Sequence, residues 1–204
     1  MKYKAIIWDF GGVITSSPFE AFNNFEEANG LPKDIIRTIN SENPDMNAWA
    51  QFESNSITID EFNDLFLKEA KAKGFDIKGK DIIKLLKGSI RENMVSFLRE
   101  LKSDFKLGCI TNNVKSSSEE NTDNETKEAM SIFDHVIESS IVGIRKPNPE
   151  IYMMSCDALN VSPDQCIYLD DLGINLKPAR ELGMTTIKVI QTEDAIQEVR
   201  NLLK

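Results

Sequence analysis

Five short, mostly apolar stretches recur along the chain, and each ends at or near a polar residue. They span residues 5–8, 107–110, 135–137, 166–169 and 185–190, the third being the weakest. Because the stretches are continuously apolar rather than alternating, they favour strands covered on both faces, as in a parallel sheet. Amphipathic segments of helical period separate them, which predicts a doubly wound α/β domain.

Residues 16–85 break this rhythm, and no strand is predicted there. Thr58 and Glu61 have the three-residue spacing of a capping box at the start of an amphipathic helix. Further phenylalanine-rich stretches suggest more helices of the same kind. We therefore expect an α/β core built from residues 1–15 and 86–204, with residues 16–85 inserted after the first strand as a helical cap.

The composition narrows the class of protein and of partner. With 204 residues, 41% of them hydrophobic and 28% charged, the chain is typical of a soluble globular protein. A formal net charge of -9 argues against nucleic acid as the main partner. We expect no export signal or membrane span, and three cysteines without Cys-x-x-Cys spacing suggest a reduced, cytoplasmic protein. The segment 115–128 has no apolar residue and predicts an exposed loop or a frayed helix start.

Three of the predicted strands end in residues that can bind metal or phosphate. Asp9 follows the first strand, Thr111 and Asn112 follow the second, and Asp170 and Asp171 follow the fourth. Ligands of parallel sheets bind beyond the carboxyl ends of the strands, so we expect these residues at one edge. Unpaired carboxylates would repel one another, and a divalent cation with oxygen ligands, Mg²⁺ above all, would relieve this repulsion. The alternative is that each acid caps the turn or helix that follows it.

The segment GIRKPNPEIY adds a positive charge. Lys146 precedes Pro147 and Pro149, which favour an extended lead-in and a helix that begins near Glu150. A lysine on a rigid turn suggests a positioned charge, able to keep Asp9 ionised and to offset a phosphoryl group. The alternative is an ordinary solvated lysine.

Four segments together resemble a known family. WDFGGVIT, ITNN, RKPNPEIY and YLDDLGINLKPARELGM, in this order, are similar to the four motifs of the haloacid dehalogenase-like hydrolase superfamily. The last two resemble the amino-terminal phosphatase domain of soluble epoxide hydrolases and the related domain fused to some acyl-CoA dehydrogenases. The resemblance implies a Rossmann-like core with a helical cap inserted after the first motif, in agreement with the insertion expected above.

The resemblance also implies roles for the residues at the strand ends. Asp9 would be the nucleophile that forms an aspartyl-phosphate with a small phosphorylated metabolite. Thr111 and the amide of Asn112 would bind the phosphate oxygens, and Lys146 would steady both the nucleophile and the transferred group.

For the metal, the resemblance implies Mg²⁺ bound by Asp9, the backbone carbonyl of Gly11 and Asp171. Asp170 would be an alternate ligand or would support the ligands from behind. Asn175 stands where the following helix is expected to begin, and we interpret it as the N-cap of that helix.

One acid of the family pattern is missing. Phosphatases of the family usually have Asp-x-Asp, in which the second aspartate moves a proton, and here that position is Gly11. Glycine can offer its carbonyl to a metal but cannot replace general acid–base help, worth about 10²–10⁴ in rate. We expect Gly11 and Gly12 to allow a tight backbone turn, so that a side chain would fit poorly at Gly11.

Three alternatives follow from the missing acid. The enzyme could be selective for substrates with good leaving groups, an acid of the cap (Glu20, Glu53 or Asp60) could substitute, or the protein could bind a phosphorylated ligand with little turnover. A dehalogenase is less favoured, since it should not need the metal site. The sequence therefore predicts a Mg²⁺-dependent phosphomonoester hydrolase of weak or leaving-group-selective activity, with a ligand-binding module as the alternative.

Overall fold

A five-stranded parallel sheet forms the centre of the molecule in the computed structural model, which describes residues 2–114 and 124–204. Its order is β3-β2-β1-β4-β5. All five predicted strands are confirmed. Their bounds are β1 Ala5–Trp8, β2 Lys106–Thr111, β3 His135–Glu138, β4 Cys166–Asp170 and β5 Thr185–Lys188.

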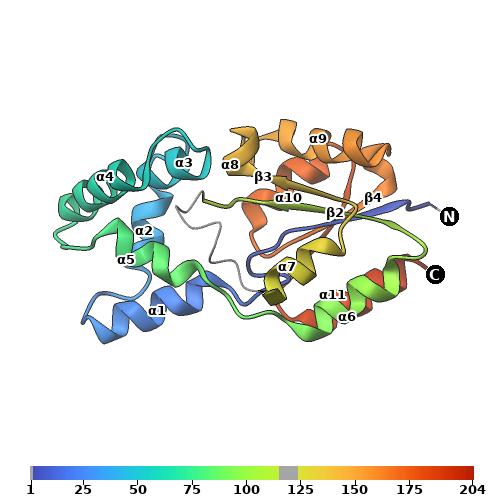
Figure 1. Cartoon of the computed structure of the whole chain (residues 1–204), viewed down its shortest axis with the longest axis horizontal. Helices are drawn as coiled ribbons and strands as arrows, with labels where there is room; N and C mark the ends of the chain where they lie inside the picture. The colour runs from blue at the N-terminus through green and yellow to red at the C-terminus, as the bar shows by residue number, and fades with distance from the viewer. Residues whose placement is uncertain (1, 115–123) are drawn as a thin grey trace.

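Helices cover both faces of the sheet (Figure 1). One face packs against α6 (Glu92–Leu101), α7 (Asn124–Ser131) and α11 (Thr192–Leu202), and the other against α9 (Pro149–Leu159) and α10 (Gly173–Glu181). Side chains of β1 alternate between the two apolar clusters: Ile6 and Trp8 belong to one, Ala5 and Ile7 to the other. Both faces are thus buried, which explains the continuous apolar runs. The short helices α8 (Ser139–Val142) and η3 (Pro163–Gln165) complete the connections.

Strand register decides which residues meet at the edge of the sheet. Trp8 of β1 pairs with Cys109 of β2 on one side and with Leu169 of β4 on the other. The residues just beyond these pairs therefore emerge side by side at the carboxyl end of the central strands.

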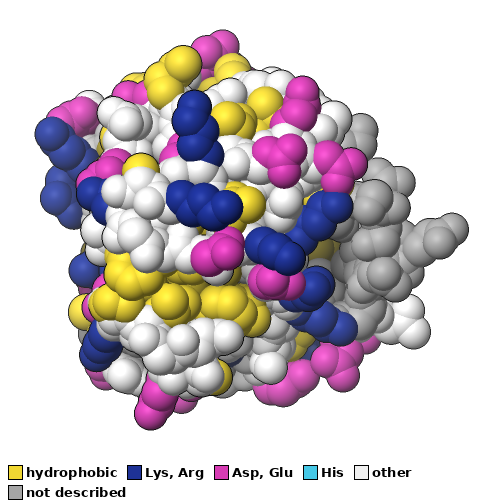
Figure 2. Space-filling view, turned by 90° about the vertical axis from the view of Figure 1, so that its left-hand side faces the viewer, with side chains coloured by type: hydrophobic (Ala, Val, Ile, Leu, Met, Phe, Trp, Pro, Cys, Tyr) yellow, Lys and Arg dark blue, Asp and Glu magenta, His cyan; other side chains and the backbone are white. Residues whose placement is uncertain are grey.

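Between β1 and α6 lies a separate group of helices without a strand. Its elements are α1 (Pro18–Ala28), α2 (Ile35–Ser41), α3 (Ala48–Glu53), α4 (Ile59–Ala72), α5 (Gly79–Ile83) and η1 (Lys84–Leu86). These helices bury their own apolar cluster, which includes Phe22, Phe52, Phe62 and Phe66. Together they form a helical cap inserted into the α/β core. On the outer face of this cap, basic and acidic side chains are interspersed around a band of hydrophobic ones (Figure 2).

The chain enters and leaves the cap along two adjacent segments. Thr15 and Ile90 form an antiparallel bridge, and the amide of Ser16 donates to the carbonyl of Ser89 at 2.8 Å. Both chain termini lie at the opposite end of the molecule (Figure 1). The cap therefore faces the carboxyl ends of the strands.

Local predictions have mixed outcomes. The capping box of α4 is confirmed: Thr58 accepts from the amide of Glu61, and the Glu61 side chain accepts from the amide of Thr58. The three cysteines are free and buried. Of the predicted polar loop, residues 115–123 lie outside the described part of the chain, and residues 124–128 belong to α7. Among the described residues, no helix combines the length and apolar character needed to cross a membrane.

Candidate active site

The side chain of Lys146 lies between two carboxylates. Its Nζ is 2.7 Å from Oδ1 of Asp9 and 2.8 Å from Oδ2 of Asp170. Lys146 and Asp170 are almost fully buried, and Asp9 is only 7% exposed. The lysine from the loop before α9 thus reaches the tips of β1 and β4, as a positioned charge rather than a solvated one.

Every Asp170 carboxylate oxygen is occupied by donors. Besides Lys146, the hydroxyl of Tyr168 donates to Oδ2, and the amide of Leu172 donates to Oδ1 at 2.8 Å. The Asn175 carboxamide donates to both oxygens at 3.1 Å. A carboxylate held in this way is well placed to orient Lys146.

The interpretation of Asn175 as an N-cap is wrong. The N-cap of α10 is Leu172, and Asn175 lies inside the first turn, where it is 3% exposed. Because Asp170 accepts from the amide of Leu172, the helix begins earlier than the polar residue suggested. This leaves the Asn175 side chain free to bind Asp170 instead of capping the helix.

Asp171 completes an acidic cluster. Asp9, Asp170 and Asp171 each place one carboxylate oxygen in this cluster, and the three oxygens lie within 4.8 Å of one another. Asp171 is partly exposed, whereas Asp170 is fully buried. Three hard oxygen donors so close together fit a divalent cation such as Mg²⁺.

The electrostatics of the cluster are unbalanced. Burial raises the pKa of Asp9 well above its usual range, although the Lys146 ammonium opposes that rise. Burial alone would lower the pKa of Lys146, but the carboxylates of Asp170 and Asp9 outweigh it and raise that pKa. Burial, with the nearby Asp170, raises the pKa of Asp171 to about 6. One ammonium thus faces three carboxyl groups, and additional positive charge would stabilise them in their ionised form.

Thr111 and Asn112 lie at the end of the neighbouring strand, β2. Thr111 is its last residue and is 6% exposed. The Asn112 side chain accepts from the amide of Lys146 at 2.8 Å and donates to the carbonyl of the same residue at 3.0 Å. These two hydrogen bonds fix the backbone that presents the lysine.

Of the two glycines after Asp9, only Gly12 is sterically required. It has φ +80, and a Cβ there would lie 2.3 Å from Oδ2 of Asp171. Gly11 has no positive φ, and a Cβ there would meet no atom within 4 Å. The expectation that a side chain fits poorly at Gly11 is therefore wrong, because the tight turn is made by its neighbour.

The three cap acids differ in their surroundings. Glu20 is exposed in the first turn of α1, and Asp60 is exposed with an oxygen 2.6 Å from Nζ of Lys80. Glu53 is buried at the end of α3 and accepts from Nε of Arg145 at 2.7 Å. Of the three, only Glu53 contacts residues of the α/β core through its side chain in the described structure.

Comparison with known protein families identifies the family of the chain. The family model described as haloacid dehalogenase-like hydrolase matches residues 3–183. The chain belongs to this family.

Curated relatives of this hydrolase cover its whole length. It is 31% identical to mouse acyl-CoA dehydrogenase family member 10 and 30% identical to mouse bifunctional epoxide hydrolase 2, each over 99% of the chain. The chain spans only 19% and 39% of the length of these two relatives. It is also 26% identical to a sesquiterpene phosphatase of Aspergillus oryzae, covering 98% of this chain and 97% of the relative.

Solved structures share the fold of this haloacid dehalogenase-like hydrolase. A predicted HAD-like family hydrolase from Porphyromonas gingivalis superposes with a TM-score of 0.69 at 19% identity, over 100% of this chain and 99% of that one. A HAD family enzyme from Bacteroides thetaiotaomicron, in complex with magnesium and inorganic phosphate, superposes with a TM-score of 0.62 at 22% identity, over 91% and 93% of the two chains.

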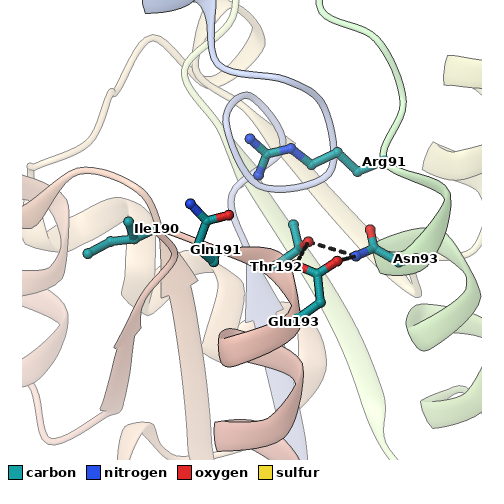
Figure 3. Close-up of a pocket in the computed structure, with 6 residues that line it drawn as sticks. All are labelled: Arg91, Asn93, Ile190, Gln191, Thr192 and Glu193. Carbon is teal, nitrogen blue, oxygen red and sulfur yellow. Dashed lines mark hydrogen bonds between the residues drawn. The ribbon is translucent and has the colours of Figure 1, made fainter.

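A pocket of about 490 Å³ borders the loop that follows Asp9 in this hydrolase (Figure 3). Arg91 lines it and donates to the carbonyl of Gly12 at 2.8 Å. Across the pocket, the Asn93 side chain donates to Thr192 and Glu193, which ties α6 to the start of α11. Arg91 therefore holds the glycine turn from outside the acidic cluster.

Sequence reasoning missed several residues that support the site. Tyr168 lies two residues before Asp170 on the same strand, and because side chains at i and i+2 share a face, this contact was open to prediction. The Tyr152 hydroxyl donates to the carbonyl of Asn175 at 2.8 Å. Arg145 and the buried position of Glu53 depend on contacts between distant segments, for which the sequence carries no local signal.

Proposed function

We propose that this chain is a Mg²⁺-dependent phosphatase that hydrolyses a small phosphorylated metabolite. The proposal rests on one observation above all: Lys146 Nζ lies within 2.8 Å of both Asp9 and Asp170, beside a third carboxylate that completes an oxygen cluster. The similarity to a sesquiterpene phosphatase over nearly the whole of both chains supports a phosphoryl substrate.

Asp9 is the proposed nucleophile. A carboxylate oxygen of Asp9 attacks phosphorus, the ester P–O bond breaks, and its electron pair leaves with the alcohol oxygen, which takes a proton from water. Water then attacks the phosphorus of the aspartyl-phosphate and releases inorganic phosphate and the free Asp9 carboxylate. The position of Asp9 at the tip of a rigid central strand supports this role, because little reorganisation is needed to present its oxygen.

Three polar residues around Asp9 are proposed to bind the phosphoryl group. Lys146 offsets the negative charge on the transferred oxygens, and Thr111 and the Asn112 amide donate to them. Asp170 orients Lys146, which its full set of donor contacts supports. All these groups come from the ends of β1, β2 and β4 or from the loop before α9.

The donor set suits Mg²⁺. Asp9, the Gly11 carbonyl and Asp171 would hold the ion, and Asp171 is better placed than Asp170 because the Asp170 oxygens already accept several hydrogen bonds. When bound, Mg²⁺ supplies positive charge that balances the carboxylates and the incoming phosphate. Arg91 would keep the neighbouring Gly12 carbonyl, and with it the turn, in place.

Activity is proposed to favour good leaving groups. Gly11 carries no acid, and none of the three cap acids offers an evident proton donor to the site: Glu20 and Asp60 are exposed, and Glu53 is bound by Arg145. A leaving group of low basicity needs no protonation as it departs, so its cleavage does not lose the factor of about 10²–10⁴ in rate that a general acid would supply.

The test compares p-nitrophenyl phosphate with a simple alkyl phosphate, each with Mg²⁺ and with EDTA. We expect Mg²⁺-dependent turnover of the aryl ester and little of the alkyl ester, and Asp9→Asn serves as the inactive control. Equal rates on both esters would contradict leaving-group selectivity, and full activity in EDTA would contradict the metal site.

The missing acid at Gly11 also favours a second candidate, a module that binds a phosphorylated ligand with little turnover. This candidate predicts no turnover of either ester, together with Mg²⁺-dependent binding of inorganic phosphate in calorimetry. Turnover that Asp9→Asn abolishes would exclude it.

A further inference from the structure

Glu53 is a buried carboxylate whose contacts lie mostly outside its own helix. It ends α3 of the cap and is 7% exposed. Its Oε2 accepts from Nε of Arg145 at 2.7 Å and from Nδ2 of Asn112 at 3.4 Å, while Oε1 accepts from the Trp49 indole at 2.8 Å. Its backbone carbonyl accepts from the hydroxyl of Ser139 at 2.8 Å. Three separate segments of the α/β core therefore converge on one residue of the cap.

Two core residues that contact the Glu53 carboxylate, Arg145 and Asn112, are linked directly to Lys146. Arg145 directly precedes Lys146 in the chain. Asn112 holds the Lys146 backbone through two hydrogen bonds, at 2.8 and 3.0 Å. A continuous series of contacts thus leads from Glu53 through Arg145 and Asn112 to Lys146, and from there to Asp9.

Arg145 also contacts a second segment of the cap. Its Nη1 donates to the carbonyl of Pro44 at 3.0 Å, in the connection between α2 and α3. The guanidinium is therefore clamped between two parts of the cap while its backbone continues into Lys146. If the cap moved away, Arg145 would lose both contacts at once.

We propose that Glu53 is a positioning residue, which couples the seating of the cap to the placement of Asn112 and Lys146. The proposal rests on the phosphatase function proposed above and adds a role for the cap in that reaction. Glu53 does not replace the missing acid: within residues 2–114 and 124–204 its carboxylate oxygens meet only N–H donors, so it acts as an acceptor that is bound to Arg145.

A positioning residue and a proton donor predict different kinetics for Glu53→Gln. A positioning role predicts that kcat falls by the same factor for p-nitrophenyl phosphate and for an alkyl phosphate, because Lys146 acts on the phosphoryl group of both. Misplaced reacting groups typically cost about tenfold to 10²-fold. A lost proton donor instead predicts a larger loss for the alkyl ester, whose leaving group needs the proton.

The experiment measures kcat and KM for both esters in Glu53→Gln, Arg145→Gln and the double variant. Thermal melting curves give the folded fraction of each variant, and the rates are divided by that fraction. We expect an equal loss of about tenfold or more in kcat in each single variant, and no further loss in the double variant, since both break one link. Asp81→Asn is the matched control, because its ion pair with Lys84 lies wholly within the cap.

Binding of inorganic phosphate with Mg²⁺, measured by calorimetry, separates this proposal from the phosphatase function. If the wild type binds phosphate but cleaves no ester, the function fails while the coupling is still tested, and weaker phosphate binding in Glu53→Gln than in Asp81→Asn supports it. Rates and binding within twofold of the wild type in Glu53→Gln, or a loss confined to the alkyl ester, would overturn the proposal.

Discussion

At the residue scale, Gly11 and Gly12 are neighbours with different constraints. Position 12 requires glycine, because its φ is positive and because the Asp171 carboxylate leaves no room for a Cβ. Gly11 faces open space, and its backbone is one that other residues can adopt. The position that lacks the family's usual acid is therefore able to accept a side chain.

This difference makes Gly11→Asp informative. We predict that the variant folds and that its kcat on an alkyl phosphate rises, by up to the 10²–10⁴ that general acid–base help supplies, while p-nitrophenyl phosphate gains much less. Steady-state kinetics on both esters measures the effect. Gly11→Asn is the control, since it has the same shape without a transferable proton. An equal gain in both variants, or none on the alkyl ester, would show that the missing acid does not limit the reaction.

The sequence predicted the carboxylates and the lysine of the site, but not the contact between Glu53 and Arg145. Asp9, Asp170 and Asp171 were predicted to meet because parallel strands share one functional edge, and one oxygen from each lies within 4.8 Å of the others. Lys146 was predicted from its rigid turn to be a positioned charge, and its Nζ contacts Asp9 and Asp170. Glu53 and Arg145 are 92 positions apart, and their contact depends on how the cap packs against the core. No local pattern encodes such a contact.

At the element scale, the five strands were predictable because burial on both faces requires continuous apolar runs. The observed ends differ from the predicted ones by two residues at most. The start of α10 was not predicted correctly: Asn175 was expected to be the N-cap, but the N-cap is Leu172, whose amide donates to Asp170. The helix therefore begins at Gly173. Where the N-cap residue is apolar and makes no side-chain cap hydrogen bond, as is the case for Leu172, a search for a polar N-cap residue fails.

Helix α3, which presents Glu53, depends on one asparagine. Asn47 is buried and accepts from the amide of Ala50 at 2.8 Å, while its carboxamide donates to the carbonyls of Asn40 and Glu42, both at 2.8 Å. The residue therefore caps α3 and fastens it to the end of α2.

We predict that Asn47→Ala lowers the free energy of unfolding by about 2 kcal/mol, since it removes a helix cap and two buried donors. Urea denaturation measures this change. Asn47→Ser keeps an oxygen that can cap the helix but loses the two donors, so it should lie between Asn47→Ala and the wild type. If the urea midpoint of Asn47→Ala equals that of the wild type, other contacts stabilise α3.

At the scale of the whole molecule, the cap and the core have separate apolar clusters and meet at the carboxyl ends of the strands. The sequence predicted this division, because a helical stretch interrupts the α/β rhythm. The net charge of -9 leaves the protein acidic overall, yet Lys146 is buried against Asp9 and Asp170. The proposed recognition of an anionic phosphate therefore depends on the local charge of the site and not on the overall charge.

Covalent chemistry at Asp9 is the central step of the proposed reaction. The direct measurement is to quench the wild-type protein with acid during turnover of p-nitrophenyl phosphate with Mg²⁺, trap acyl phosphates with hydroxylamine, and map the modified peptide by mass spectrometry. We predict an aspartyl hydroxamate at Asp9, and none in Asp9→Asn or after EDTA treatment. Turnover by the wild type without modification of Asp9, or with modification of a different residue, would contradict the account.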